Sequence, residues 1–324
     1  MKGGWSLFSR DVGKYPLWAW IIGGMSAPLA YLAGRDSWLT VLVVGVVCCV
    51  LCRLVHLAAD IQAEHSRWYC AVQVIWLAVI SREIGGWTAQ CWPTGNGFPL
   101  VPITLLVLAT FAAWDGAERA SRTGSVLFWF LVLLYGIILA SGVQNLELAY
   151  LKPDIKLPSP LLIVVFLIPA AASFLPSEKR GSSIALGAVL LLSVAVSMLT
   201  AGTLSLQVAQ SSRLPFYEFS KSLSLFGIAE RFEAFVSVAL TIGFFSLLAF
   251  LISAAGHLTE RVLPGRGRAG VLITAGLAGT LMVLLPKIPA LLLACLSIML
   301  WGFLPLILAG YQGIKKSKKT QKNP

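Results

Sequence analysis

The stretch VSVALTIGFFSLLAFLISAA, residues 236–255, contains no charged side chain. A helix rises 1.5 Å per residue, so this stretch is long enough to cross a hydrocarbon layer of roughly 30 Å. A second stretch, residues 184–206, is apolar in the same continuous way. Strands of a membrane barrel alternate between apolar and polar residues, and neither stretch alternates. Both stretches therefore predict membrane-spanning helices.

The composition of the whole chain supports the same interpretation. Of its 324 residues, 57% are hydrophobic and 12% are charged, and the mean hydropathy is +0.83. A water-soluble domain of this size does not carry so much apolar surface. We expect a single all-α integral membrane domain over residues 1–324, with about ten transmembrane helices. The spans are predicted at 17–33, 38–55, 68–86, 98–114, 126–143, 160–176, 184–209, 228–256, 269–286 and 289–311.

The basic residues predict the orientation of these spans. Of the 25 lysines and arginines, 17 fall in one alternate set of loops and in the two terminal segments. The side of a membrane that is richer in basic loop residues is the cytoplasmic one. Both termini are therefore expected in the cytoplasm, which requires an even number of spans. The first apolar block runs into the charged turn at 34–36 rather than a cleavage site, so it is interpreted as a mature helix and not a signal peptide.

The net charge of +11 does not indicate a nucleic-acid-binding protein. The basic residues are spread over the loops, and the dense cluster at 315–322 follows the last span, where polybasic segments contact lipid headgroups. The six cysteines include the pair Cys49 and Cys52, but this pair lies inside an apolar span, where cysteine packs as a small apolar residue. We expect no metal, no cofactor and no nucleic acid partner.

Two spans contain residues that break helices at matching positions. The first span contains IGGMSAP at 22–28, and the sixth contains IPAAAS at 168–173. Transporters built from two inverted halves of five helices bind substrate where the first helix of each half is unwound. The pattern predicts a 5+5 inverted repeat of the LeuT type with broken first and sixth helices. Close helix packing is the alternative explanation for the same glycines and prolines.

Charged residues near the ends of the spans form a second group of candidates. Asp115 with Arg119, and Glu118 with Arg122, are acid-before-base pairs four residues apart on one helical stretch. The pair at 82–83 closes the predicted third span. These residues are interpreted either as structural clamps at the membrane surface or as a proton or gating relay, with the glutamates as carriers.

Two further patterns argue against an enzyme. The sequence GRGRAG at 265–270 matches the dinucleotide-binding pattern GxGxxG, but no strand is predicted before it. The three histidines are not spaced as metal ligands, and no phosphate-binding loop is present. We predict a protein that is not an enzyme.

Three segments resemble one family. AGRDSW at 33–38 is similar to the turn that joins the first two spans of the B subunits of GerA-type spore-germination receptors (the GerAB family). GAERASR at 116–122 resembles that family's GxExxxR stretch. LPFYEF at 214–219, followed by ERFEA at 230–234, resembles its passage into the eighth span. The charged residues of these segments are Arg35, Asp36, Glu118, Arg122, Glu230, Arg231 and Glu233.

The resemblance implies a permease-like subunit of a nutrient germinant receptor, in the amino acid/polyamine/organocation transporter superfamily. Such a subunit binds a small germinant, of the amino acid class, at the membrane midplane and signals germination. It acts with an A subunit and a lipoprotein C subunit in the spore inner membrane. Contacts in that superfamily come from spans one, three, six and eight, which here offer Gly23, Gly24, Ser26, Gln73, Trp76, Pro169, Ser173, Ser237 and Thr241. The alternatives are an amino-acid or polyamine transporter and a membrane scaffold with a vestigial pocket.

Overall fold

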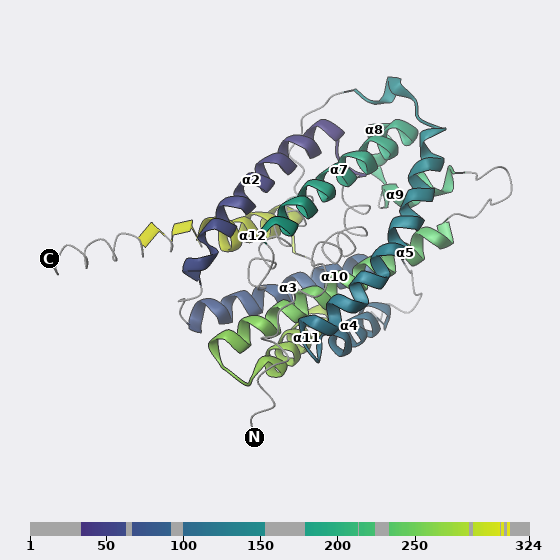
Figure 1. Cartoon of the computed structure of the whole chain (residues 1–324). Helices are drawn as coiled ribbons and strands as arrows, with labels where there is room; N and C mark the ends of the chain where they lie inside the picture. Colours follow the sequence, from purple (N-terminus) through teal and green to yellow (C-terminus); the bar gives the residue numbers. More distant parts are fainter. Residues whose placement is uncertain are drawn as a thin grey trace.

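The computed structural model describes residues 34–62, 67–91, 100–152, 179–212, 214–223, 233–284, 288–304, 306–307 and 310–311. Over these ranges the chain is helical and contains no strand (Figure 1). The described elements are α2 (Trp38–Gln62), α3 (Arg67–Cys91), α4 (Leu100–Ala113), α5 (Ala117–Val143), η2 (Leu148–Tyr150), α7 (Lys179–Leu204), α8 (Leu206–Ser211), α9 (Pro215–Lys221), α10 (Glu233–Val262), α11 (Gly267–Leu284), α12 (Ala290–Ser297) and the π-helical turn η3 (Ile298–Phe303).

Helix α10 is the centre of the described bundle. It packs against α3, α4, α5 and α11. From Leu247 to Leu258 every residue of α10 is buried, on all faces of the helix. A helix that is apolar all round must be enclosed by other helices, and this explains why the stretch at 236–255 lacks a polar face.

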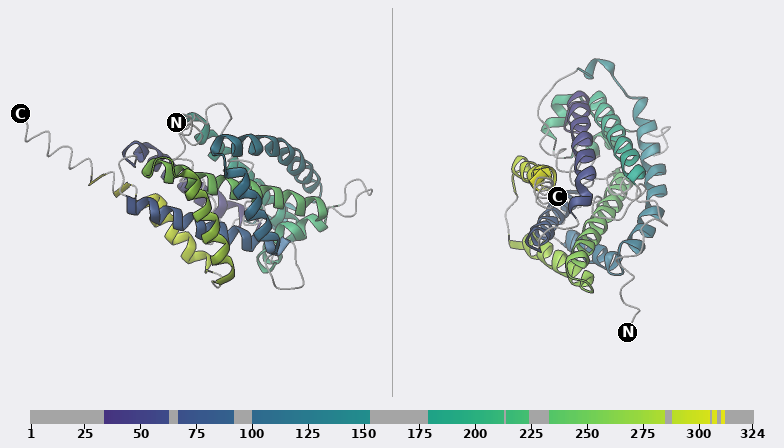
Figure 2. Two further views of the ribbon diagram at one scale, coloured as in Figure 1. Left: turned by 90° about the horizontal axis from the view of Figure 1, so that it is seen from below. Right: turned by 60° about the vertical axis from the view of Figure 1, so that its left-hand side comes forward.

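Helices α2 and α7 form a second group beside this bundle, and Figure 2 shows them running next to each other, with α5 beside α7. Gly45 of α2 allows their close approach, because a Cβ atom there would lie in the space of the Leu190 side chain of α7. Helix α5 contacts both α7 and α10, so it joins the two groups. Small residues at helix contacts are typical of packing between membrane helices.

The outward faces of the helices carry apolar side chains. On α2 these are Val43, Val46, Val47 and Val50, each about half exposed, at the spacing of one helical face. On α5, Trp129 is 67% exposed. Water-soluble proteins rarely expose continuous apolar surfaces of this extent, whereas a lipid environment favours them.

Four of the described helices contain segments long and apolar enough to cross a membrane, namely Val126–Val143, Gly187–Leu204, Glu233–Glu260 and Gly267–Leu284. Three shorter apolar segments lie at Trp38–Leu51, Leu100–Ala113 and Leu292–Phe303. Helices cover eight of the ten predicted spans. The other two, 17–33 and 160–176, lie outside the described residues, so the ten-helix inverted repeat with broken first and sixth helices stays a prediction.

The connections between helices gather at two opposite ends of the molecule. At the first, Nε1 of Trp38, the first residue of α2, donates to the carbonyl oxygen of Leu151, which follows α5, at 3.3 Å. At the second, Arg268 of α11 pairs with Asp115 of the α4–α5 turn, at 3.2 Å. We call these the outer end and the inner end.

Two predicted boundaries differ from the observed ones. The predicted second span ended at 55, whereas α2 continues without a break to Gln62. The predicted third span ended at 86, whereas α3 continues to Cys91. The described part of the connection between α7 and α10 contains the short helices α8 and α9.

Candidate functional site

Helices α3 and α10 carry four of the predicted ligand-binding residues, and they run antiparallel. Near the inner end, the Cys70 thiol of α3 donates to the carbonyl oxygen of Leu258 of α10, at 3.4 Å. Near the outer end, the rings of Trp87 and Phe244 lie 6.4 Å apart. These two contacts fix which residues of the two helices lie at the same height.

Gln73 and Trp76 lie toward the inner end of α3. Gln73 is 1% exposed, and within the described part of the chain its Nε2 atom has no hydrogen-bond partner. Trp76 Nε1 donates to Ser297 Oγ at 3.2 Å, where α12 passes into the π-helical turn η3. π-helical turns are frequent at functional sites. This contact therefore joins α3 to a turn of a kind that often occurs in such sites.

Ser237 and Thr241 lie toward the outer end of α10. Thr241 Oγ1 donates to the carbonyl oxygen of Ser237 at 2.7 Å, as a hydroxyl in a helix often does. Gln73, one turn beyond Cys70, is level with Ala255, which lies 18 residues from Ser237 and therefore about 27 Å along the helix axis. One small ligand does not touch both groups. Five further predicted ligand residues lie outside the described residues, namely Gly23, Gly24, Ser26, Pro169 and Ser173.

Between these two groups, α3 carries a buried ion pair. Arg82 Nη1 donates to Glu83 Oε1, and the two residues are 7% and 8% exposed. Trp87 is level with Phe244, so Arg82 is level with Ala249, close to the middle of the apolar segment Glu233–Glu260. The sequence placed this pair at the end of a span. The structure places it inside the helix, because α3 extends one more turn and a half.

The position of this pair is energetically unusual. Consecutive helix residues project roughly 100° apart, so their side chains do not ordinarily face each other. A charge at membrane depth costs several kcal/mol unless it is paired. A buried pair is rarely a net source of stability, whereas removal of one partner costs about 3–5 kcal/mol. In membrane proteins, charged residues within spans mark ligand, ion or proton sites, so this buried pair is a candidate for such a site.

The outer end brings together two of the three segments that carry the family resemblance. Arg35 Nη2 donates to the carbonyl oxygen of Ser212 at 3.3 Å. A Cβ atom on Gly34 would lie 3.2 Å from Thr200 Cγ2 and 3.5 Å from Pro215 Cβ. The turn at 34–37 therefore packs between α7 and the start of α9, and we call this contact region the outer cap.

Asp36 lies in the outer cap. Its carbonyl oxygen accepts a hydrogen bond from Ser197 Oγ of α7. Its carboxylate Oδ2 is buried, and no described residue donates to it. Burial raises the pKa of Asp36 to about 7, although the positive charge of Arg35 acts in the opposite direction. This carboxyl group therefore titrates near neutral pH within the outer cap.

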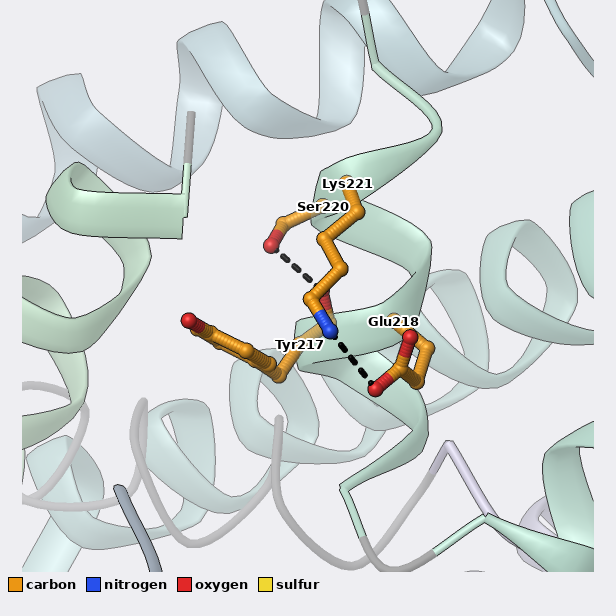
Figure 3. A network of polar contacts seen from close by, with 4 residues as sticks. All are labelled: Tyr217, Glu218, Ser220 and Lys221. Carbon is orange, nitrogen blue, oxygen red and sulfur yellow. Dashed lines mark hydrogen bonds and ion pairs between the residues drawn. The ribbon is translucent and has the colours of Figure 1, made fainter. Parts of the chain in front are cut away.

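Helix α9 closes the outer cap and carries a small exposed polar cluster (Figure 3). Lys221 Nζ donates to Glu218 Oε1 at 2.9 Å and lies 4.8 Å from the centre of the Tyr217 ring. Its hydrogen bond with Glu218 raises the pKa of Lys221. Both charged side chains are more than 40% exposed, so this cluster contributes little to stability.

The predicted charged pairs near the inner end are only partly described. Asp115 accepts a hydrogen bond from Arg268 Nη2 of α11 at 3.2 Å, and its predicted pair with Arg119 stays a prediction. The side chains of residues 117–123, which include Glu118, Arg119 and Arg122, lie outside the described ones. So do Glu230 and Arg231, whereas Glu233 begins α10.

The GxGxxG pattern at 265–270 forms the tight turn between α10 and α11. Gly265 has a φ angle of +81°, which favours glycine. The backbone N–H groups of Gly265 and Gly267 donate to the two carboxylate oxygens of Glu260, at 2.8 and 2.6 Å. A Cβ atom on Gly270 would lie 3.0 Å from the carbonyl oxygen of Ala255. Gly265 and Gly270 therefore each have a structural reason in a helical hairpin, with a helix and not a strand before the turn.

Some residues of the site were not among those predicted. Ser193, Ser197 and Thr200 of α7 are fully buried, and the last two meet the 34–37 turn. Their spacing of three and four residues, which places small hydroxyls on one helical face, was the available signal. Among the residues with described positions, no group of three or more histidine, cysteine, aspartate or glutamate side chains is arranged to hold a metal ion.

No protein-family model matches this sequence, and no curated protein matches it at a significant level.

Proposed function

We propose that this chain is the permease-like subunit of a nutrient receptor of the spore-germination type, which binds a small molecule of the amino acid class within its helical bundle. The observation that carries the proposal is the buried Arg82–Glu83 pair near the middle of α10. The resemblance of the segments at 33–38, 116–122 and 214–234 to that receptor family supplies the biological role.

The chemistry of the pair fits an amino acid. A guanidinium group binds a carboxylate through two parallel hydrogen bonds, and a carboxylate accepts hydrogen bonds from an ammonium group. A zwitterion offers both complementary groups on neighbouring atoms. It therefore replaces the internal ion pair by two intermolecular ones without leaving an unpaired charge at membrane depth.

The outer cap supports a signalling role for binding. Arg35 joins the 34–37 turn to the backbone just before α9, and Gly34 packs against both α7 and α9. Ligand binding favours whichever arrangement of the helices gives it more contacts. In the proposed receptor, the cap is the element whose position changes, and the A subunit and the lipoprotein C subunit sense that change.

Binding is tested by thermal shift of the purified chain against a panel of amino acids, nucleosides and sugars. We expect at least one amino acid to raise the melting temperature, since a ligand that binds only the folded state stabilises it. Glu83→Gln should abolish the shift, and Gly24→Leu should also do so if the first helix lines the same pocket. Glu218→Gln on exposed α9 is the matched control and should retain the shift.

A shift that survives in Glu83→Gln would remove the pair from the proposed site. If neither the wild-type chain nor the chain with its co-expressed partner subunits responds to any compound, the membrane scaffold replaces the receptor as the better proposal.

A transporter of the same superfamily is the second candidate, because buried charged pairs also occur along transport pathways. Reconstituted vesicles separate the two functions. Uptake of the compound that gives the thermal shift would favour a transporter, and binding without uptake would favour a receptor. The proposed receptor also requires a spore inner-membrane location with both termini cytoplasmic, which fluorescent fusions in sporulating cells would test.

A further inference from the structure

Helices α4 and α11 enclose a groove on the side of the bundle, with a volume of about 520 Å³. Its walls include Phe111, which is 73% exposed, and Leu272, which is 51% exposed. Helix α11 carries one of the four segments long enough to span a membrane. The groove therefore opens sideways, at the depth of the hydrocarbon layer.

The lining of this groove presents almost only carbon. The two hydroxyl groups along it are turned back to their own helices, since Thr110 Oγ1 donates to the carbonyl oxygen of Leu106 at 2.6 Å and Thr280 Oγ1 to that of Gly276 at 3.0 Å. A molecule in the groove meets no hydrogen-bond donor that is still available from these threonines. Only an apolar occupant is matched to such a lining.

Glycines give the groove its depth. A Cβ atom on Gly276 would meet nothing within 4 Å, and one on Gly279 would meet only Leu106 Cδ2, at 3.6 Å. Helices α4 and α11 would therefore pack together equally well with a side chain at these two positions. The space that they leave is open to an occupant from outside.

A cation is fixed at the inner end of the groove. Trp114, the residue that follows α4, also lines the groove, and the Arg268 guanidinium lies 5.7 Å from the centre of its ring. The Arg268 side chain is 52% exposed and pairs on one side with Asp115. Arg266, two residues earlier, is exposed as well. Glu260, at the end of α10, already accepts two backbone N–H groups.

We infer that this groove binds an acyl chain of an anionic phospholipid, with the lipid phosphate at Arg268 and Arg266. An apolar channel that ends in an exposed guanidinium matches the two parts of one lipid molecule. Basic pockets between helices on the cytoplasmic side are known to recognise anionic headgroups, and tryptophan is common at that depth. This site is separate from the Arg82–Glu83 pair and does not depend on the proposed function.

Native mass spectrometry of the purified chain, exchanged into detergent with equal amounts of phosphatidylglycerol and phosphatidylcholine, tests the inference. We expect one phosphatidylglycerol to be retained in preference to phosphatidylcholine. Arg268→Gln should reduce that preference about fivefold, the effect of one basic residue beside an anionic lipid. Lys152→Gln, which removes an exposed positive charge at the outer end, should not change it.

A second experiment fills the groove with a side chain. Gly276→Leu places a side chain in open space, so it should fold normally and lose the retained lipid. Gly136→Leu, at an equally open and exposed position of α5, is the matched control and should retain it.

Two results would overturn the inference. One is equal retention of both lipids by the wild-type chain and by Arg268→Gln. The other is a dimer that dissociates only in Gly276→Leu, because the groove would then hold a helix of a second copy.

Discussion

Arg35 donates a hydrogen bond to the carbonyl oxygen of Ser212, and this contact joins two segments that lie 177 residues apart in the chain. One segment precedes α2 and the other separates α8 from α9. Both carry part of the family resemblance. Their contact places these two motifs, which are distant in the sequence, in one structural unit, the outer cap.

Replacement of Arg35 by alanine should loosen the outer cap. The carbonyl oxygen of Ser212 would lose its side-chain donor, so α8 and α9 should open more often. Hydrogen exchange followed by mass spectrometry should show faster exchange over 206–223, while the α10–α11 turn at 260–270 remains unchanged. Equal acceleration at both places would indicate general destabilisation rather than a local role.

Asp36 predicts a specific pH dependence. Its folded-state pKa of about 7 lies above the ordinary value of 3.8, so the fold favours the protonated form. The stabilisation that comes from its protonated form is therefore fully present below about pH 3.8 and is lost as the pH rises through 7. Asp36→Asn should be more stable than the wild type at pH 8, and the difference should shrink toward pH 4. Melting temperatures of both proteins across this range would measure the effect.

The Arg82–Glu83 pair predicts non-additive substitutions. Arg82→Gln or Glu83→Gln alone leaves one buried charge without this partner and should cost about 3–5 kcal/mol of unfolding free energy. The double substitution removes both charges and should cost less than the sum of the two. Unfolding in mixed detergent micelles would give these values. Strict additivity would mean that the two side chains do not stabilise each other.

Gly270 and Gly276 of α11 predict opposite effects of alanine. At Gly270 the added Cβ atom would meet the Thr259 side chain and, at 3.0 Å, the carbonyl oxygen of Ala255. Gly270→Ala should therefore destabilise the fold by about 1–3 kcal/mol. At Gly276 nothing lies within 4 Å, so Gly276→Ala should stabilise the helix by roughly 0.5–1 kcal/mol. Thermal melts of the two variants should move in opposite directions.

The apolar periodicity was enough to predict most of the helices. Continuous apolar runs such as 236–255 are longer than the apolar runs in helices of water-soluble proteins, so α10 was predicted from length and hydropathy alone. The end of α3 was not predicted well. Its last residues, 87–91, include Trp87, Thr88 and Gln90, which are less apolar than the span before them, although the helix continues.

The site was harder to predict because it depends on contacts between distant segments. Superfamily resemblance grouped Gln73 with Ser237, but the antiparallel packing of α3 and α10 separates them along the helix axis. The sequence also did not show how deep in the bundle Arg82 and Glu83 lie, since their depth follows from where α3 aligns with α10. The GxGxxG pattern could be set aside correctly, because a dinucleotide site requires a preceding strand.

The central position of α10 also constrains the order in which the protein is assembled. Ribosomes synthesise chains from the N-terminus, and α3, α4 and α5 are complete about a hundred residues before the end of α10 emerges. Their common packing partner is absent during that interval. We therefore expect these three helices to complete their packing only when the last third of the chain has been inserted.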